Sequence, residues 1–306
     1  MKPIELDVII PVKDRATVGQ CVSNLLAQIE LVEGMGLGQI LLCDGGSCQS
    51  DCQQQIRQVA QSPSVIALAC PHLGFNKGWL LNQGLEAATA PIVLISDVDI
   101  LWNAAVLSSL GTAAASHPER LYYVRSVQES QPTAAAVQRL RYAYRLERLA
   151  AGDRVEVYPA LPPNGDRPGY GLICGQRTLL HQVGGYRHGF QGWGWEDQDL
   201  LIRTQLLGYS VAALGKVTHL SHADTQRNAF SQQMPQQTPQ QSRDRNILFC
   251  LAGLAQGRLQ GDLPSAQSLS NTRMQSAAPI SVHYQPQPDH APNLDYSLPR
   301  SPQPPD

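Results

Sequence analysis

The chain has 306 residues, 42% of them hydrophobic and 16% charged, and its formal net charge at pH 7 is −2. The hydrophobic fraction is sufficient for a sizeable core, in one large domain or two small ones. The charge balance gives no sign of the concentrated basic surface of a nucleic-acid-binding protein, and no run approaches the roughly 18 apolar residues of a membrane span. The apolar run near the N-terminus is too short for a secretory signal, so we expect a cytoplasmic protein.

The first hundred residues alternate between predicted strands and helices. We predict strands at 6–12, 39–43, 65–69 and 91–96. Helices are predicted at 17–33, after residue 47 and through about residue 60, and at 78–88. This alternation predicts an α/β fold in which helices cover both faces of a mostly parallel sheet. Such sheets bind ligands at the carboxyl ends of their strands, where Asp14, Asp44 and Asp97 lie.

The pattern is less regular after residue 100. We predict a helix at 133–151, a loop rich in proline and glycine at 158–171, a helix between 194 and 207, a strand at 211–220 and a short helix from 246 to about 259. Residues 223–245 contain QQMPQQTPQQ, which indicates a flexible polar loop. The remainder, 260–306, is rich in Ser, Pro and Gln and is expected to be a disordered tail. One domain therefore spans 1–259, with halves at 1–102 and 103–259.

Two acidic residues, Asp97 and Asp99, follow the apolar strand that ends at residue 96. Carboxylates separated by one residue at a strand end can converge on a divalent cation and a ribose. Oxygen ligands suit Mg²⁺ or Mn²⁺, and such a cation can neutralise a diphosphate leaving group. The alternative is a solvated turn, because acidic turns are common at strand ends.

The segment GWGWEDQD at 192–199 places three carboxylates and two tryptophans at the start of a helix. Acidic residues in a first turn stabilise a helix by capping and through its dipole, which accounts for one or two of the acids. Capping does not account for Trp193 and Trp195, whose indole faces suit the apolar faces of a sugar ring. The segment therefore predicts a sugar-binding site.

Two histidines and a glycine-rich turn supply further candidates. Either His219 or His222 could give a nitrogen ligand to the same cation, although a histidine without a ligand is the alternative. Residues three apart on a strand point to opposite faces, so we expect only one of them to be a ligand. In GFNKG at 74–78, Asn76 and Lys77 precede a helix, which suits either a phosphate or ribose site or an ordinary N-cap. No P-loop or G-x-G-x-x-G pattern occurs.

The order of these motifs resembles that of inverting glycosyltransferases of the GT-A fold, most closely the branch of β-1,4-galactosyltransferases and bacterial chondroitin-type polymerases. The matching segments lie between about residues 5 and 225: VIIPVKDR at 8–15, DGGS at 44–47, GFNKGWLLNQG at 74–84, ISDVDILW at 95–102, GWGWEDQD at 192–199, and His219. The resemblance implies a metal-dependent hexosyltransferase that moves a sugar from a nucleotide-diphosphate sugar, expected to be a UDP-sugar, to an acceptor hydroxyl. The half at 1–102 would bind the nucleotide, and the half at 103–259 would bind the acceptor.

The resemblance also implies residue roles. The donor would be bound by a set from both halves: Pro11, Asp14, Asp44, Asn76, Lys77, Asp97 and Trp193. Asp99 and a histidine, His219 before His222, would hold Mn²⁺ or Mg²⁺, with Asp97 as a further candidate ligand. Asp197 would be the catalytic base and Glu196 would bind acceptor hydroxyls. Trp195 stands where relatives often carry a small residue, and Gln198 replaces an acid of the galactosyltransferases, which predicts a differently shaped acceptor site that includes Trp193 and Trp195.

Two other functions are less consistent with these motifs. A nucleotidyltransferase that makes nucleotide sugars usually has a glycine-rich basic loop after its first strand, and VIIPVKDRATVG lacks those glycines. A non-catalytic carbohydrate-binding protein on the same fold should have lost an acid from SDVD or GWGWED, and none is missing. The acceptor could be a glycan, a lipid or a small molecule. The arginines at 139, 141, 145 and 148 suggest peripheral contact with anionic lipid, binding of a phosphorylated acceptor, or a solvated basic face.

Overall fold

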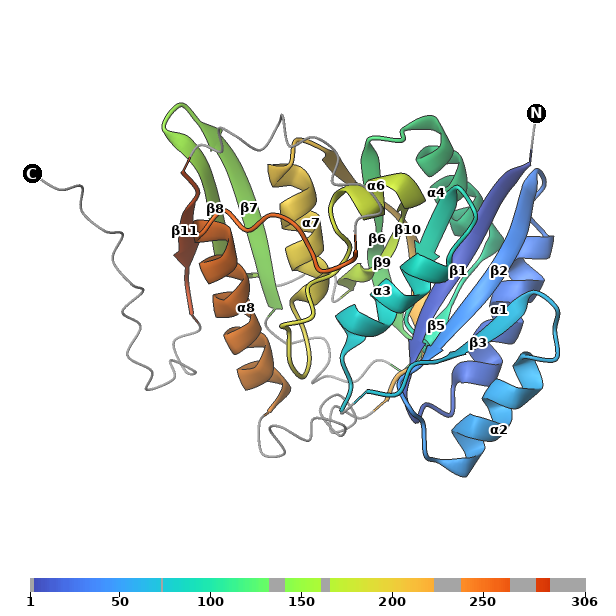
Figure 1. Cartoon of the computed structure of the whole chain (residues 1–306). Helices are drawn as coiled ribbons and strands as arrows, with labels where there is room; N and C mark the ends of the chain where they lie inside the picture. The colour runs from blue at the N-terminus through green and yellow to red at the C-terminus, as the bar shows by residue number, and fades with distance from the viewer. Residues whose placement is uncertain are drawn as a thin grey trace, which may run out of the picture.

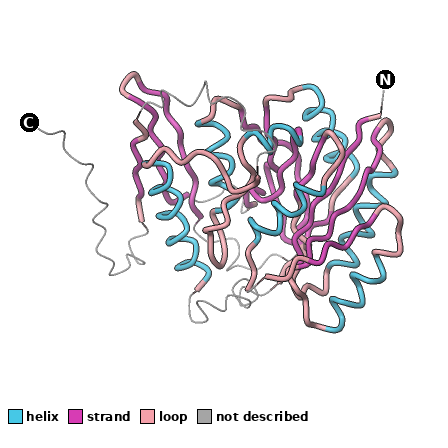
Figure 2. Tube along the Cα trace, in the orientation of Figure 1, coloured by secondary structure: helices cyan, strands magenta, loops and turns pink. Residues whose placement is uncertain are grey.

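The computed structural model describes residues 3–72, 74–131, 141–160, 166–222, 238–264 and 279–286. Within these ranges the chain forms an eight-stranded sheet and a separate three-stranded sheet, shown in Figures 1 and 2. The strand order is β3-β2-β1-β4-β9-β6-β10-β5 in the large sheet and β11-β8-β7 in the small one. The predicted α/β class is confirmed, with helices packed around the large sheet.

The N-terminal half follows the predicted alternation closely. Its elements are β1 (Ile4–Val12), α1 (Val18–Glu30), β2 (Met35–Asp44), α2 (Ser50–Val59), β3 (Val65–Ala69), α3 (Lys77–Ala87) and β4 (Ile92–Ile95). β1 pairs in parallel with both β2 and β4, so the carboxyl ends of these strands meet at one edge. This edge carries the first acidic motif.

The other strands of the large sheet come from the second half of the chain. They are β5 (Ile100–Leu101), β6 (Arg120–Glu129), β9 (Arg167–Gln176) and β10 (Ser210–His219), with helices α4 (Ala104–Ser116), α6 (Arg177–Gln182) and α7 (Glu196–Leu206). β9 runs antiparallel to β4 and β6, whereas β10 runs parallel to β6. The sheet is therefore mixed, and it brings the ends of β4, β6 and β10 close together.

Alternating side chains of β1 pack into two buried layers, one on each face of the large sheet. Val8 and Ile10 pack in one cluster with α1 and α4, whereas Ile9 packs in another with α3, α6 and α7. The same α7 also contributes Ile202 and Leu206 to a third cluster with the small sheet. In Figure 1, α7 accordingly lies between the two sheets. The helix that carries the second acidic motif is thus held by two cores.

The small sheet occupies segments for which we predicted a helix and a loop. β7 (Arg141–Leu149) and β8 (Gly152–Ala160) form an antiparallel hairpin, so the helix expected at 133–151 is wrong over its described part. Tyr142, Tyr144 and Leu146 alternate along β7 toward the third core, a period of two that helix-forming Ala, Arg and Leu residues obscured. The loop expected at 158–171 is likewise partly strand, because β8 and β9 extend into it.

Two further boundaries differ from prediction. α8 (Pro239–Ala255) begins earlier than expected because Thr238 and Gln241 form a capping box and Pro239 occupies the first turn. The end of the expected loop at 223–245 is therefore helix, and 223–237 lies outside the described residues. β11 (Ser281–Tyr284) pairs in parallel with β8 inside the segment expected to be disordered. No helix in the described parts of the chain is both long and apolar enough to cross a membrane.

Candidate active site

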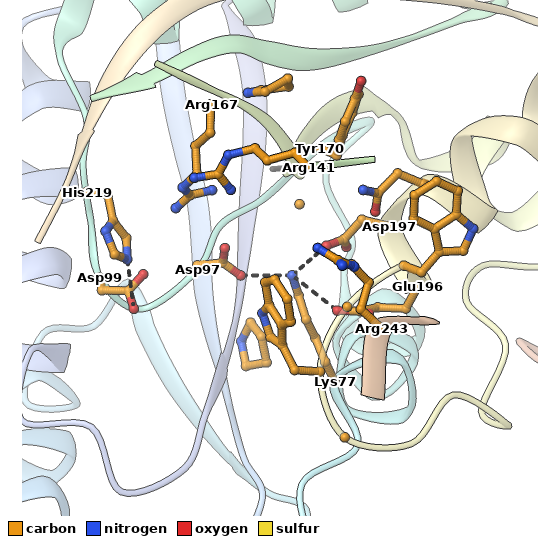
Figure 3. Close-up of a pocket in the computed structure, with 18 of the residues that line it drawn as sticks. Lys77, Asp97, Asp99, Arg141, Arg167, Tyr170, Glu196, Asp197, His219 and Arg243 are labelled. Carbon is orange, nitrogen blue, oxygen red and sulfur yellow. Dashed lines mark hydrogen bonds and ion pairs between the residues drawn. The ribbon is translucent and has the colours of Figure 1, made fainter. Parts of the chain in front are cut away.

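A cavity of about 240 Å³ lies where the large and small sheets meet α7 and α8. Its wall contains the ends of β1 and β4, the start of α7 and the end of β10. Both predicted acidic motifs and both histidines reach this one cavity: Asp97, Asp99, Glu196, Asp197, His219 and His222. Figure 3 shows Asp97 and Asp99 on one side of the Lys77 ammonium and Glu196 and Asp197 on the other.

Asp99 and the two histidines form a compact group of possible metal ligands. Asp99 is buried, and its Oδ2 lies 3.5 Å from His219 Nε2 and 3.2 Å from His222 Nε2. One ligand atom from each of the three residues lies within 4.8 Å of the others. Pairing of β5 with β10 aligns Ile100 with His219 and thereby places Asp99 beside it. Both histidines face Asp99, because β10 ends at His219 and strand alternation does not extend to His222. The expectation that only one of them is a metal ligand stays a prediction.

Glu129 orients His219, and the sequence motifs did not reveal it. It is aligned with His219 across the β6–β10 pair, and its Oε2 accepts a 2.6 Å hydrogen bond from His219 Nδ1. With Nδ1 bound to Glu129, His219 presents Nε2 to Asp99, where a protonated Nε2 donates to the carboxylate and a deprotonated Nε2 can offer its lone pair to a cation. Burial opposes ionisation of both carboxyls, but the histidine hydrogen bonds outweigh it, lowering the pKa of Asp99 and bringing that of Glu129 to about 2. Asp99 is therefore held as an ionised carboxylate beside the imidazole nitrogens of His219 and His222.

Lys77 connects the two acidic motifs. Its Nζ lies 2.9 Å from Asp97 Oδ1, 2.9 Å from Asp197 Oδ2 and 4.0 Å from Glu196 Oε1. Burial would lower the pKa of Lys77, but the surrounding carboxylates raise it well above its usual value, so it stays charged. Figure 3 shows this ammonium between the two groups of acids. Lys77 therefore fixes the separation between the strand-end acids and α7.

The first two acids of α7 are buried and hard to ionise. Burial, followed by the charge of Asp197, raises the pKa of Glu196 to about 7. Burial also raises the pKa of Asp197, although Lys77 acts in the opposite direction. The helix dipole alone would lower both pKa values, so burial is the stronger effect here. Carboxyls of this kind are stronger bases than exposed ones once they ionise.

Trp193 and Trp195 differ in their placement. Trp193 is half-buried and lines the cavity, and its backbone N–H donates to Ser242 Oγ of α8. Trp195 borders the cavity, but only 1% of it is exposed and it packs in the core of the small sheet. Its φ of 79° is rare for a non-glycine residue and turns the chain into α7. Trp195 therefore exposes almost none of its indole in this structure, and its contact with an acceptor stays a prediction.

The third acid of the motif has a structural position. Asp199 is fully buried and accepts hydrogen bonds from Arg203 Nε at 2.7 Å and Arg187 Nη1 at 3.0 Å. Arg203 also donates to the carbonyl oxygens of Val183 and Gly185, both at 2.8 Å. This network ties α7 to the loop after α6 and accounts for an acid that the sequence left unassigned.

Other predicted donor residues lie beside the cavity. Pro11 lines it, but Asp14, Asp44 and Asn76 are not among its lining residues. The Asp14 carboxylate accepts backbone N–H groups at the start of α2, Asp44 binds the Ser47 hydroxyl, and Asn76 caps α3. These residues shape the loops around the cavity, and their contact with a donor stays a prediction.

Several cavity residues were not predicted. They include cationic and aromatic side chains from both sheets and from α8: Lys13, Arg15, Arg141, Arg167, Tyr170 and Arg243. Arg141 and Arg243 belong to segments predicted as helix and loop, so their positions could not be inferred. Arg145 and Arg148 instead lie more than half exposed next to acids of the hairpin, as on a solvated face. Arg139 lies outside the described residues.

Comparisons with solved structures show what the fold resembles. GalNAc-T7 with UDP, GalNAc and Mn²⁺ aligns with a TM-score of 0.54 at 13% identity, over 72% of this chain and 44% of that one. This chain therefore spans less than half the length of that protein. The mannosyltransferase PcManGT from Pyrobaculum calidifontis, in complex with GDP-Man and Mn²⁺, aligns with a TM-score of 0.48 at 18% identity, over 85% of this chain and 72% of that one. The predicted GT-A fold is confirmed.

Family comparisons agree with the fold. A search of curated proteins gives no match. The model described as N-terminal domain of galactosyltransferase matches residues 163–225, which contain GWGWEDQD and both histidines. The model of glycosyl transferase family 2 matches residues 7–169, more than half of the chain. The chain therefore belongs to glycosyl transferase family 2.

Proposed function

We propose that this protein is a metal-dependent glycosyltransferase that moves a sugar from a nucleotide-diphosphate sugar to an acceptor hydroxyl with inversion at the anomeric carbon. The observation that carries the proposal is the single cavity in which the Asp99–histidine group, Lys77 and the buried acids of α7 meet. Family membership and the resemblance to galactosyltransferases support a UDP-sugar as donor. The acceptor is a hydroxyl-bearing glycan, lipid or small molecule. A cytoplasmic location stays a prediction.

Asp99, His219 and His222 are the residues that would hold the cation. Their ligand atoms are close enough to share one ion, and Glu129 supports the outer side of His219. Two imidazole nitrogens suit Mg²⁺ poorly, because Mg²⁺ prefers oxygen ligands, so Mn²⁺ is the proposed metal. When bound, the cation would neutralise negative charge on the diphosphate leaving group.

Asp197 is the proposed general base. Its carboxylate would take the proton of the acceptor hydroxyl while that oxygen forms a bond to the anomeric carbon. The bond from this carbon to the diphosphate breaks on the opposite face, and the nucleoside diphosphate leaves. A positioned base of this kind typically contributes about 10²–10⁴-fold. Lys77 holds the carboxylate in place, and Glu196, with a pKa of about 7, can hydrogen-bond acceptor hydroxyls.

The test is a panel of UDP- and GDP-sugars incubated with purified protein and Mn²⁺, with the nucleotide product identified. A nucleoside diphosphate supports glycosyl transfer. Formation of UTP or GTP together with a sugar 1-phosphate, in a parallel reaction with added pyrophosphate, would indicate a nucleotidyltransferase. Ligand binding without any product would indicate a non-catalytic protein. With the active donor, Asp197→Asn should lose most of kcat and keep donor affinity. A nearly active Asp197→Asn beside an inactive Glu196→Gln would reverse the two roles.

A further inference from the structure

Gly171 on β9 faces the ion pair at the centre of the cavity. A Cβ atom built on this glycine would lie 2.6 Å from Asp197 Oδ2 and 2.7 Å from Lys77 Nζ. Both distances are shorter than real Cβ contacts, so an alanine here would force at least one of the two side chains to move. Gly171 also lines the cavity, as do Lys77 and Asp197.

The backbone does not require glycine at this position. Gly171 is absent from the residues with positive φ, so alanine can adopt its conformation. The atoms that an added methyl group would meet are the ends of two flexible side chains rather than backbone. The strand can therefore accept alanine, and the displacement should fall on the ion pair.

We propose that Gly171 is a positioning residue: the absence of its side chain allows Lys77 to hold Asp197 at a fixed place relative to Asp97. This proposal rests on the proposed function, because it assigns Asp197 to the base. Lys77 contacts Asp97 and Asp197 at the same distance of 2.9 Å, so it sets the spacing between the donor side and the acceptor side of the cavity. Displacement of the Lys77–Asp197 pair changes the spacing between the donor side and the acceptor side, whereas the distances between Asp99 and the two histidines stay the same.

The experiment compares Gly171→Ala with Gly36→Ala in the full chain. Gly36 is a matched control because it also lies on a strand, has no positive φ, and a Cβ there would meet no atom within 4 Å. Displacement of a reacting group by about 1 Å costs about 10²-fold in rate. Gly171→Ala should therefore lose about 10²-fold in kcat with donor KM, Mn²⁺ affinity and Tm close to wild type. Gly36→Ala should match wild type in every measurement.

A double-mutant cycle separates positioning from a general structural effect. If Gly171 acts through Asp197, Gly171→Ala should cause no further loss in an Asp197→Asn background, because the group that it positions is already inactive. An additive loss would overturn the proposal, as would an unchanged kcat. A loss confined to donor KM would also overturn it, since the glycine would then make room for the donor.

A crystal structure of Gly171→Ala distinguishes this proposal from the proposed function. We expect the contact between Lys77 Nζ and Asp197 Oδ2 to be lost and that between Lys77 and Asp97 to persist. An unchanged pair would overturn the inference whether or not any nucleotide sugar is turned over, whereas an inactive wild-type protein would refute only the function. If Gly171→Ala does not fold, Lys77→Gln removes the same ion pair without altering β9, and full kcat in that variant would overturn the proposal.

Discussion

Replacement of Glu129 tests whether a carboxylate outside the cavity sets the metal affinity inside it. Glu129 accepts hydrogen bonds from His219 Nδ1 at 2.6 Å and from Ser221 Oγ at 3.0 Å, and its Oε1 lies 3.5 Å from Arg167 Nε. Loss of such an outer partner typically lowers metal affinity by about 10–100-fold, which is about 1.4–2.7 kcal/mol. Glu129→Ala should lose about 100-fold in Mn²⁺ affinity, the upper end of this range, because it removes the negative charge and the hydrogen-bond acceptor together. Glu129→Gln should stay near the lower end, because its amide oxygen can still accept the Nδ1 proton.

The assay is Mn²⁺ binding by titration calorimetry without donor, which does not depend on turnover. Glu147→Gln is the control, because Glu147 is a half-buried acid of β7 whose Oε1 lies 4.0 Å from Arg145 Nη1 and which is not among the cavity-lining residues. Tm measurements establish that each variant is folded. Equal Mn²⁺ affinity in wild type, Glu129→Ala and Glu147→Gln would refute the argument that Glu129 fixes the tautomer of His219.

Asp99→Asn should weaken Mn²⁺ and donor binding together while Tm is kept, and unchanged Mn²⁺ affinity by calorimetry would exclude Asp99 as a ligand. Asp199→Asn should lower the free energy of unfolding by about 3–5 kcal/mol, because the buried guanidinium of Arg203 loses its carboxylate. A loss in urea denaturation of only about 0.5 kcal/mol, as at a surface site, would contradict this. Burial raises the pKa of Glu196 from 4.5 to about 7, so the folded protein retains a proton that the unfolded chain has released, and stability should fall as pH rises between these values. Glu196→Gln should therefore be more stable than wild type at about pH 8 and not at about pH 4; equal stability at both would contradict the shift.

The N-terminal half was predictable because its strands contain continuous apolar runs, and β1 and β4 are buried between two layers of helices. β1, β2 and β4 end at Val12, Asp44 and Ile95, each within one residue of the predicted ends at 12, 43 and 96. β2 starts four residues earlier than the predicted 39. β7 was mispredicted because Ala, Arg and Leu favour a helix when the chain is considered locally. Its strand conformation depends on pairing with β8, and that of β11 depends on β8 as well.

The site was predictable where one motif carries several unusual side chains, as in SDVD and GWGWEDQD. The sequence could not show that Lys77 joins the two motifs, since 120 positions separate Lys77 from Asp197. Glu129 has no motif of its own and reaches His219 only through strand register. The burial of Trp195 was not predictable, because a tryptophan beside paired acids suggests a sugar platform, whereas its left-handed backbone directs it into a core.

The pairing of β11 with β8 affects how the chain folds during synthesis. β1 to β4 and their helices are contiguous, so the first half of the large sheet can assemble as soon as it leaves the ribosome. The outer edge of β8 stays open until Ser281–Tyr284 has been translated, because β11 is the strand that covers it. An open strand edge is a template for pairing with another chain. A stop codon or a purification tag placed just before β11 should therefore cause aggregation during expression, even though it leaves every cavity-lining residue in place.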